Sequence, residues 1–141
     1  MGRDERRQSI AFRFEPGTVA HLRRRAGETG ATQTALVERY VEEGLRQDEH
    51  PLIYFREAAA GRRPAVVGSR LAVADIVTTI RQNDNSVTEA AEYLELPVEH
   101  VEAALRYYAD YKEEVDAWIE HGLAAAERER ERWRRRQEAL G

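Results

Sequence analysis

Residues 9–14 read Ser-Ile-Ala-Phe-Arg-Phe, an alternation of apolar and other side chains that predicts a short β-strand. Successive strand side chains point to opposite faces, so the large apolar ones share one face. These are Ile10, Phe12 and Phe14. The opposite face carries the smaller or charged side chains Ser9, Ala11 and Arg13. Pro16 and Gly17 end the strand, and no second strand pattern lies close by to pair with it.

Two helices are predicted to follow this strand. Val19, Leu22 and Ala26 recur at helical spacing, and Gly30 suits a helix C-terminus. Thr32 is a good N-cap for the second helix. The apolar residues of that helix form doublets four residues apart: Leu36, Val37, Tyr40, Val41 and Leu45. This stripe is wider than one short helix pair can cover, and a second copy of the chain is the natural cover.

The order of strand, helix, glycine turn and wide-faced helix over residues 9–46 resembles the ribbon-helix-helix family of bacterial repressors. The resemblance implies a homodimer in which two chains each contribute one strand to an antiparallel ribbon that enters the DNA major groove. Pairing with its twin would satisfy the ladder groups of the lone strand and cover its phenylalanines. The dimer core is then expected to contain Ile10, Phe12, Phe14, Leu36, Val37, Tyr40 and Val41.

Double-stranded operator DNA is the partner that this resemblance implies, and Arg13 is the sharpest candidate contact. From the outer ribbon face its guanidinium can fork onto guanine, and the small Ser9 and Ala11 beside it let the ribbon lie flat. Thr32 and the amides of Gln33 and Thr34 form a helix N-terminus that can hold a phosphate. Arg3 and Arg7 belong to a basic N-terminal arm. The alternatives are a solubilising strand charge for Arg13 and an ordinary helix cap for Thr32.

Residues 48–112 are predicted to form a second, helix-turn-helix-like domain. Two short strands, over 50–55 and 64–67, precede a helix whose apolar residues are spaced from Val73 to Ile80. Asn83-Asp84-Asn85 is a turn, Ser86 with Glu89 is a capping box, and Pro97 fits the first position of the next helix. Residues 82–127 carry twelve acidic against two basic side chains, so we reject DNA binding by this domain.

A motif in this domain is similar to the domain-of-unknown-function family numbered 433. It comprises His-Pro at 50–51, then Gly-x-x-Pro-x-Val-x-Gly-Ser-Arg-Leu-x-Val from Gly61, and Ser-Val-x-Glu-Ala-Ala from Ser86. The resemblance implies a place in a toxin–antitoxin operon whose toxin resembles a PIN-domain ribonuclease. Gly68, Ser69 and Arg70 are interpreted as a structural turn, with a small partner site as the alternative.

A long charged helix is expected over residues 113–141. Trp133 stands among arginines, and an arginine inserted into the carboxylate pocket of a PIN-like toxin would replace the metal cation while the tryptophan anchors the helix. The alternative is a solvated helix with pairs such as Glu131 and Arg135. The candidate toxin-binding residues are Arg132, Trp133, Arg134, Arg135 and Arg136.

Other classes of protein are disfavoured. The chain has no cysteine, its four histidines lack metal-ligand spacing, and no glycine-rich phosphate loop follows a strand, so we expect no enzyme, cofactor or metal. No apolar run approaches a membrane span, which favours the cytoplasm. We therefore expect a mainly α protein with domains over 1–47, 48–112 and 113–141, acting as an antitoxin and autorepressor. The alternative is a stand-alone transcriptional regulator whose second domain binds another protein.

Overall fold

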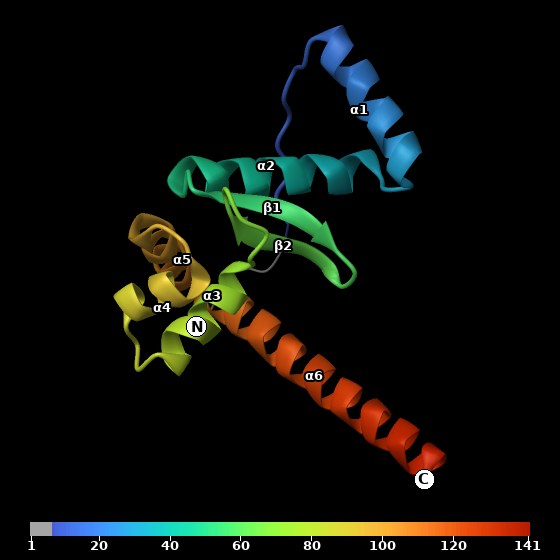
Figure 1. The fold of residues 1–141 in the computed structure, drawn as a ribbon. Helices are drawn as coiled ribbons and strands as arrows, with labels where there is room; N and C mark the ends of the chain where they lie inside the picture. Colours follow the sequence, from blue (N-terminus) through green and yellow to red (C-terminus); the bar gives the residue numbers. More distant parts are fainter. Residues whose placement is uncertain (1–6) are drawn as a thin grey trace. The chain divides into compact units, whose positions relative to one another are not determined.

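The structure, a computed structural model, describes residues 7–141 and confirms a mainly helical fold (Figure 1). Six helices and one two-stranded antiparallel sheet make up its regular structure within this range. The chain divides into two compact units, and the boundary between them falls between Glu42 and Glu43, inside the second helix. The functional domain assignments made from the sequence stay predictions.

The helices of the N-terminal unit begin and end where local chemistry predicts. α1 spans Pro16–Thr29, with proline in its first turn, and ends at Gly30, whose φ of 76° lies in the left-handed region that glycine adopts freely. α2 spans Gln33–Glu49. The backbone amide of Ala35 donates to Oγ1 of Thr32 at 3.0 Å, which confirms the predicted cap.

Residues 7–15 form neither helix nor strand in the single chain. The three apolar side chains of the predicted strand are largely exposed: Ile10 by 70%, Phe12 by 72% and Phe14 by 53%. A strand is defined by its hydrogen-bonded neighbour, and residues 7–15 pair with neither strand of the two-stranded sheet. The ribbon therefore remains a prediction about the dimer.

The second unit begins with a hairpin made of β1, Ile53–Ala58, and β2, Gly61–Val66. Its register pairs Ile53 with Val66 and Ala58 with Gly61, so only residues 59 and 60 form the turn. The predicted loop between the two strands was therefore too long. The tight turn is possible because Gly61 has a φ of 129°, which disfavours residues with a side chain.

Two helices pack against the hairpin, α3 at Val73–Gln82 and α5 at Val98–Asp110, and α4 at Val87–Leu94 packs against both of them. Asp84 and Asn85 have φ values of 55° and 62°, and the amide of Glu89 donates to Oγ of Ser86 at 3.1 Å. The predicted turn and the N-cap at Ser86 are thus confirmed. The capping box is only half formed, because the amide of Ser86 donates to the carbonyl of Asn83 at 2.9 Å. Pro97 is the N-cap of α5 and lies one residue before the predicted position. The largest fully buried side chains of this core belong to Ile53, Val66, Val73, Ile76, Val101, Tyr107 and Val115.

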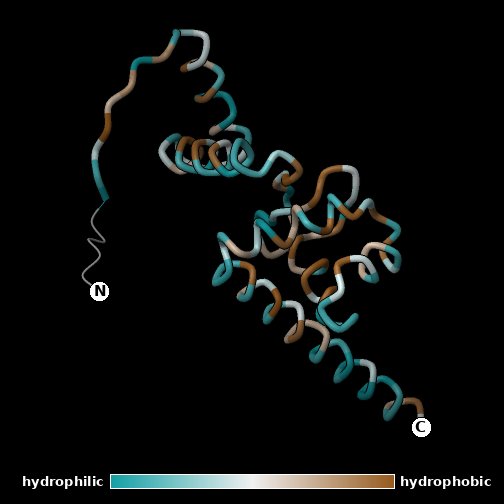
Figure 2. Tube along the Cα trace, turned by 90° about the vertical axis from the view of Figure 1, so that its left-hand side faces the viewer, coloured by the Kyte–Doolittle hydropathy of each residue, from teal (hydrophilic) through white to brown (hydrophobic). Residues whose placement is uncertain are grey.

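α6 spans Lys112–Leu140 and confirms the predicted long helix. Val115 is buried, and Trp118 and Ile119 pack against the core. From Glu120 onward almost every side chain is exposed, and Figure 2 shows the last part of this helix as mostly hydrophilic with an apolar end. None of the helices described in the structure is long and apolar enough to cross a membrane.

Candidate functional site

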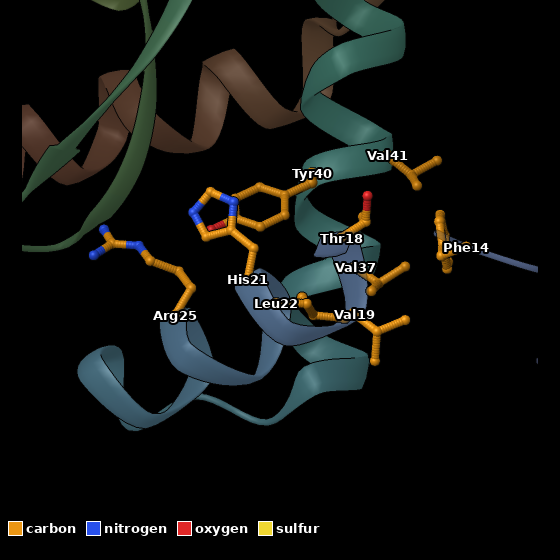
Figure 3. A pocket seen from close by; sticks show the side chains of 9 residues that line it. All are labelled: Phe14, Thr18, Val19, His21, Leu22, Arg25, Val37, Tyr40 and Val41. Atoms are coloured by element: carbon orange, nitrogen blue, oxygen red, sulfur yellow. The ribbon is translucent and has the colours of Figure 1, made fainter. Parts of the chain in front are cut away.

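An apolar groove runs along the N-terminal unit. Its volume is about 410 Å³, and Figure 3 shows the side chains from the segment before α1, from α1 and from α2 that surround it. The lining residues are Phe14, Thr18, Val19, His21, Leu22, Arg25, Val37, Tyr40 and Val41. Apolar side chains exposed together in this way are typical of surfaces that bind another molecule.

The groove contains much of the predicted dimer core. Tyr40 is 43% and Val41 54% exposed, and Val37 is half-buried. Leu36 is the exception, because it is already buried in the single chain. With Ile10, Phe12 and Phe14 also exposed, most of the predicted core residues lack a cover in one copy of the chain.

One edge of the groove is polar. Hydrogen bonding with Tyr40, and to a smaller degree with Glu28, raises the pKa of Arg25. The guanidinium of Arg25 lies 3.5 Å from Oε1 of Glu28. Both side chains are about half exposed, so the pair stabilises the fold little, and it orients the cation at the end of an otherwise apolar surface.

The predicted DNA contacts lie on exposed chain. Ser9, Ala11 and Arg13 are exposed, and Arg13 makes no hydrogen bond or ion pair with any residue from 7 to 141. Exposed positions are also found for Thr32, Gln33 and Thr34 at the start of α2. Helix geometry leaves the first amides of such a helix without an intrahelical acceptor. A helix N-terminus and a free guanidinium are therefore both accessible, and no direct interaction links them in the described chain.

Only one of the two arginines of the predicted basic arm, Arg7, is among the described residues. Arg3 lies outside the described residues. Arg7 forms an ion pair with Glu38 of α2, with both side chains at least half exposed. Exposed ion pairs of this kind contribute about 0 to 1 kcal/mol, so Arg7 can exchange Glu38 for a phosphate at low energetic cost.

A polar cluster that the sequence analysis missed joins the end of α2 to α5 and α6. Arg46 donates from Nη1 to the hydroxyl of Tyr107 at 2.9 Å, and its guanidinium lies 4.0 Å from the ring centroid of Tyr111. It also pairs with Glu114. His50, 9% exposed, lies 2.9 Å from Oδ2 of Asp110. These partners are about 60 residues apart in the sequence, and no local spacing indicates them.

Burial of Tyr107 makes the stability of the second unit depend on pH in the alkaline range. Burial raises the pKa of Tyr107 to about 12 from the usual 10, and the hydrogen bond from Arg46 opposes part of this rise. The folded chain thus holds the proton more tightly than the unfolded chain. The stabilisation is present below pH 10 and is lost as the pH rises from 10 toward about 12.

We expect the Tyr107→Phe variant to lack the contribution of this tyrosine to the pH dependence of the unfolding free energy. The wild-type chain should lose unfolding free energy relative to the variant as the pH rises above 10, because only the wild type releases this proton on unfolding. Urea denaturation of both chains at a series of pH values from 8 upward measures the difference. A difference in unfolding free energy that is constant across the series would show that Tyr107 has no raised pKa.

The exposed face of α5 is acidic. Glu99, Glu102 and Asp110 are exposed, with Arg106 as the exposed cation on the same helix. A duplex phosphate would be repelled from this face. The exposed charges of α5 therefore agree with the expectation that this helix does not read DNA.

Gly68 and Ser69 form a turn that the protein itself holds together. Gly68 has a φ of 83°, and Oγ of Ser69 donates to the carbonyl of Val66 at 3.0 Å and accepts from the amide of Leu71 at 3.2 Å. The hydroxyl of Tyr54 donates to the carbonyl of Ser69 at 2.9 Å. These bonds confirm the structural turn.

The arginines near Trp133 are paired with glutamates of their own helix. Arg134 lies 2.7 Å and Arg135 3.9 Å from carboxylate oxygens of Glu131, while Arg136 lies 3.2 Å and Arg132 3.7 Å from those of Glu129. Each arginine of the predicted toxin-binding set therefore has an ion-pair partner within α6. Two glutamates, Glu129 and Glu131, share the four arginines. Trp133 is 59% exposed. All these pairs are exposed and are easily exchanged for another partner.

A second cavity of about 360 Å³ lies in the second unit. Its walls include Asp75, Thr78 and Thr79 of α3, and Arg63, whose guanidinium lies 4.9 Å from the ring centroid of Trp118. No group of three or more histidine, cysteine or carboxylate side chains within residues 7–141 is placed to hold a metal ion.

Residues 53–108 match the family described as "Protein of unknown function (DUF433)". The matched segment begins at β1 and ends within α5, so it comprises the hairpin and three helices of the second unit. The similarity to this family expected from the sequence motif is thereby confirmed for this segment. No curated protein and no solved structure matches the chain.

Proposed function

We propose that this protein is a dimeric antitoxin that represses its own operon, with its N-terminal unit binding operator DNA and its second unit and α6 binding a PIN-like ribonuclease toxin. The observation that carries the proposal is the uncovered apolar surface of the N-terminal unit. Phe12 and Phe14 are exposed on a segment of alternating pattern, and the groove between α1 and α2 lies beside it.

A ribbon-helix-helix dimer would cover both features at once. Two copies of residues 9–14 would pair as antiparallel strands and turn Ile10, Phe12 and Phe14 toward the helices of both chains. The groove that includes Val37 and Val41 would then receive side chains from the partner. Burial of these apolar surfaces is the main force for association.

The same pairing directs Arg13 toward DNA. It alternates with Phe12 and Phe14, so it lies on the face opposite the core, and the two-fold axis presents it twice. The lack of any partner for Arg13 within residues 7–141 supports this role, because a guanidinium that is already paired would have to break that contact first. Thr32 and the first amides of α2 would hold phosphates on either side of the ribbon.

Replacing Arg13 with alanine tests the DNA-binding half of the proposal. A bidentate contact to guanine provides about 1 to 3 kcal/mol of discrimination, and each dimer carries two, so operator affinity should fall at least about tenfold. The variant should remain a folded dimer, because the side chain is exposed. A gel-shift titration measures the affinity, with Arg128→Ala on α6 as the control. Unchanged affinity of the Arg13 variant would contradict the assigned role.

Toxin binding is assigned to α6, on the exposed Trp133 and the arginines near it. Their glutamate partners contribute little to stability, so a toxin pocket rich in carboxylates can replace them. The acidic face of α5 supports a protein partner for the second unit, because it disfavours nucleic acid.

The alternative is a stand-alone ribbon-helix-helix regulator whose second domain binds another protein. The internal pairing of the α6 arginines favours this alternative, because paired arginines do not require a foreign carboxylate. The neighbouring gene distinguishes the two functions. A small nuclease encoded beside this protein supports the antitoxin, and its absence supports the regulator.

A further inference from the structure

The exposed half of α6 carries a row of side chains of which the toxin-binding role uses only Trp133. They follow each other at alternating intervals of three and four residues, and four are apolar while Arg130 and Gln137 are polar: Leu123, Ala126, Arg130, Trp133, Gln137 and Leu140. This spacing places them along one side of the helix, as in a coiled-coil seam. Trp133 is 59% and Leu140 84% exposed, and Leu123, at the edge of the cavity in the second unit, is 63% exposed, so most of the row lacks a cover in the single chain.

The charges that flank this row change sign halfway along it. Glu127 and Glu129 lie beside the row in its first half, and Arg134 and Arg136 lie beside it in its second half. On each side of the row, a glutamate is thus followed by an arginine one heptad nearer the C-terminus. A helix with this pattern is complementary to a copy of itself that runs in the opposite direction.

We propose that α6 pairs with α6 of a second chain as an antiparallel two-helix coiled coil centred between Arg130 and Trp133. In the register with the best match, Leu123 faces Leu140 of the other copy, Ala126 faces Gln137, and Arg130 lies against the ring of Trp133. Glu127 then meets Arg134 and Glu129 meets Arg136, and the two-fold axis repeats each contact. The cation and the aromatic face attract each other in the central layers.

The antiparallel direction follows from the same residues. A parallel pair would place Arg130 against Arg130 and bury two like charges in the seam, which is strongly unfavourable. It would also leave Arg136 without an acidic residue opposite it on the partner helix. The antiparallel pair removes this repulsion and provides four ion pairs across the interface. The present ion pairs of Arg134, of Arg136 and of Glu127 with Arg130 are exposed and weak, so they can be exchanged.

This pairing does not depend on the proposed operator binding, but it bears on toxin binding because both use Trp133, Arg134 and Arg136. A tail that is paired with its twin cannot also occupy a toxin pocket, so the two states exclude each other. Chains already joined through their N-terminal units would pair more readily, because the tether raises the effective concentration of the second helix.

Cysteine cross-linking of the full chain tests the register, and the chain has no cysteine to interfere. We expect Ala126→Cys combined with Gln137→Cys to form a disulfide-linked dimer under mild oxidation, seen on a non-reducing denaturing gel. Neither single variant should cross-link, because eleven residues of helix place identical positions about 16 Å apart along the axis, beyond the roughly 7 Å limit between Cα atoms. Both positions are exposed, so the fold is unaffected.

The outcomes of this experiment are distinct. A covalent dimer from the double variant alone supports the proposal. Cross-linking of Ala126→Cys by itself indicates parallel pairing and overturns the proposal, as does a double variant that stays monomeric on the gel. Because the readout is located in α6, it is independent of whether Arg13→Ala changes operator affinity.

A charge exchange in the double-cysteine background tests the ion pairs. Glu127→Arg should slow cross-linking by about fivefold to tenfold by placing like charges face to face at two sites, and adding Arg134→Glu should restore the rate. Arg128→Glu, on the opposite side of the helix, is the matched control and should leave the rate nearly unchanged. Equal rates for all variants would overturn the proposed register.

Discussion

In the chain that lacks residues 127–141, which cannot pair through α6, the Phe12→Asp variant is expected to be a folded monomer that no longer binds operator DNA. In the proposed dimer each aspartate would be a carboxylate buried without a partner, which costs several kcal/mol, and the two-fold axis doubles the cost. Affinity between chains should fall by at least about a thousandfold, since each 1.4 kcal/mol is a factor of ten. Phe12 is 72% exposed in the single chain, so the fold of one copy does not depend on it.

Sedimentation and a gel shift measure the two effects of this substitution together. Phe12→Leu is the control, because it keeps an apolar side chain at the same position and should preserve both the dimer and DNA binding. Circular dichroism should show unchanged helix content in both variants. An aspartate variant that remains dimeric and binds DNA with wild-type affinity would show that residues 9–14 do not form the interface.

Removal of residues 127–141 is expected to abolish toxin neutralisation and to spare DNA binding. The deleted segment contains Trp133 and every arginine of the candidate toxin-binding set, whereas the core contacts of α6 end near Ile119. The truncated chain should therefore keep its fold and its N-terminal unit. Where the neighbouring gene encodes a small nuclease, co-expression with that nuclease measures protection, and a gel shift measures operator affinity.

A shorter deletion provides the control for this prediction. Removing only residues 138–141 keeps the arginines and Trp133, and it should preserve protection. If the chain lacking residues 127–141 still protects fully, toxin binding does not reside in α6. If it also loses DNA binding, the two functions are not divided between the units as proposed.

The helix boundaries could be predicted because each depends on neighbouring residues. Gly30 ends α1 through its positive φ, Thr32 and Ser86 cap the helices that follow them, and Asp84 and Asn85 adopt the left-handed turn. Apolar spacing likewise predicted α3 from Val73. These features involve chemistry within a few residues, which a single sequence displays directly.

Features formed by distant residues were not predictable in the same way. The hairpin is longer than expected, because strand pairing between Ala58 and Gly61 extends into a stretch that composition alone marks as a loop. Arg46 reaches Tyr107 across 61 residues, and no spacing rule connects them. In the candidate site, the alternation at residues 9–14 indicated which side chains share a face. The proposed pairing would need a second chain, which one sequence does not display, and in one copy Phe12 and Phe14 are exposed.

Analytical ultracentrifugation of the chain that lacks residues 127–141 tests the central claim most directly, because it removes any pairing through α6 and leaves only the N-terminal interface. The account predicts a dimer at micromolar concentration, held together by the strands of residues 9–14 and the apolar groove of α1 and α2. A well-folded monomer at that concentration would contradict it.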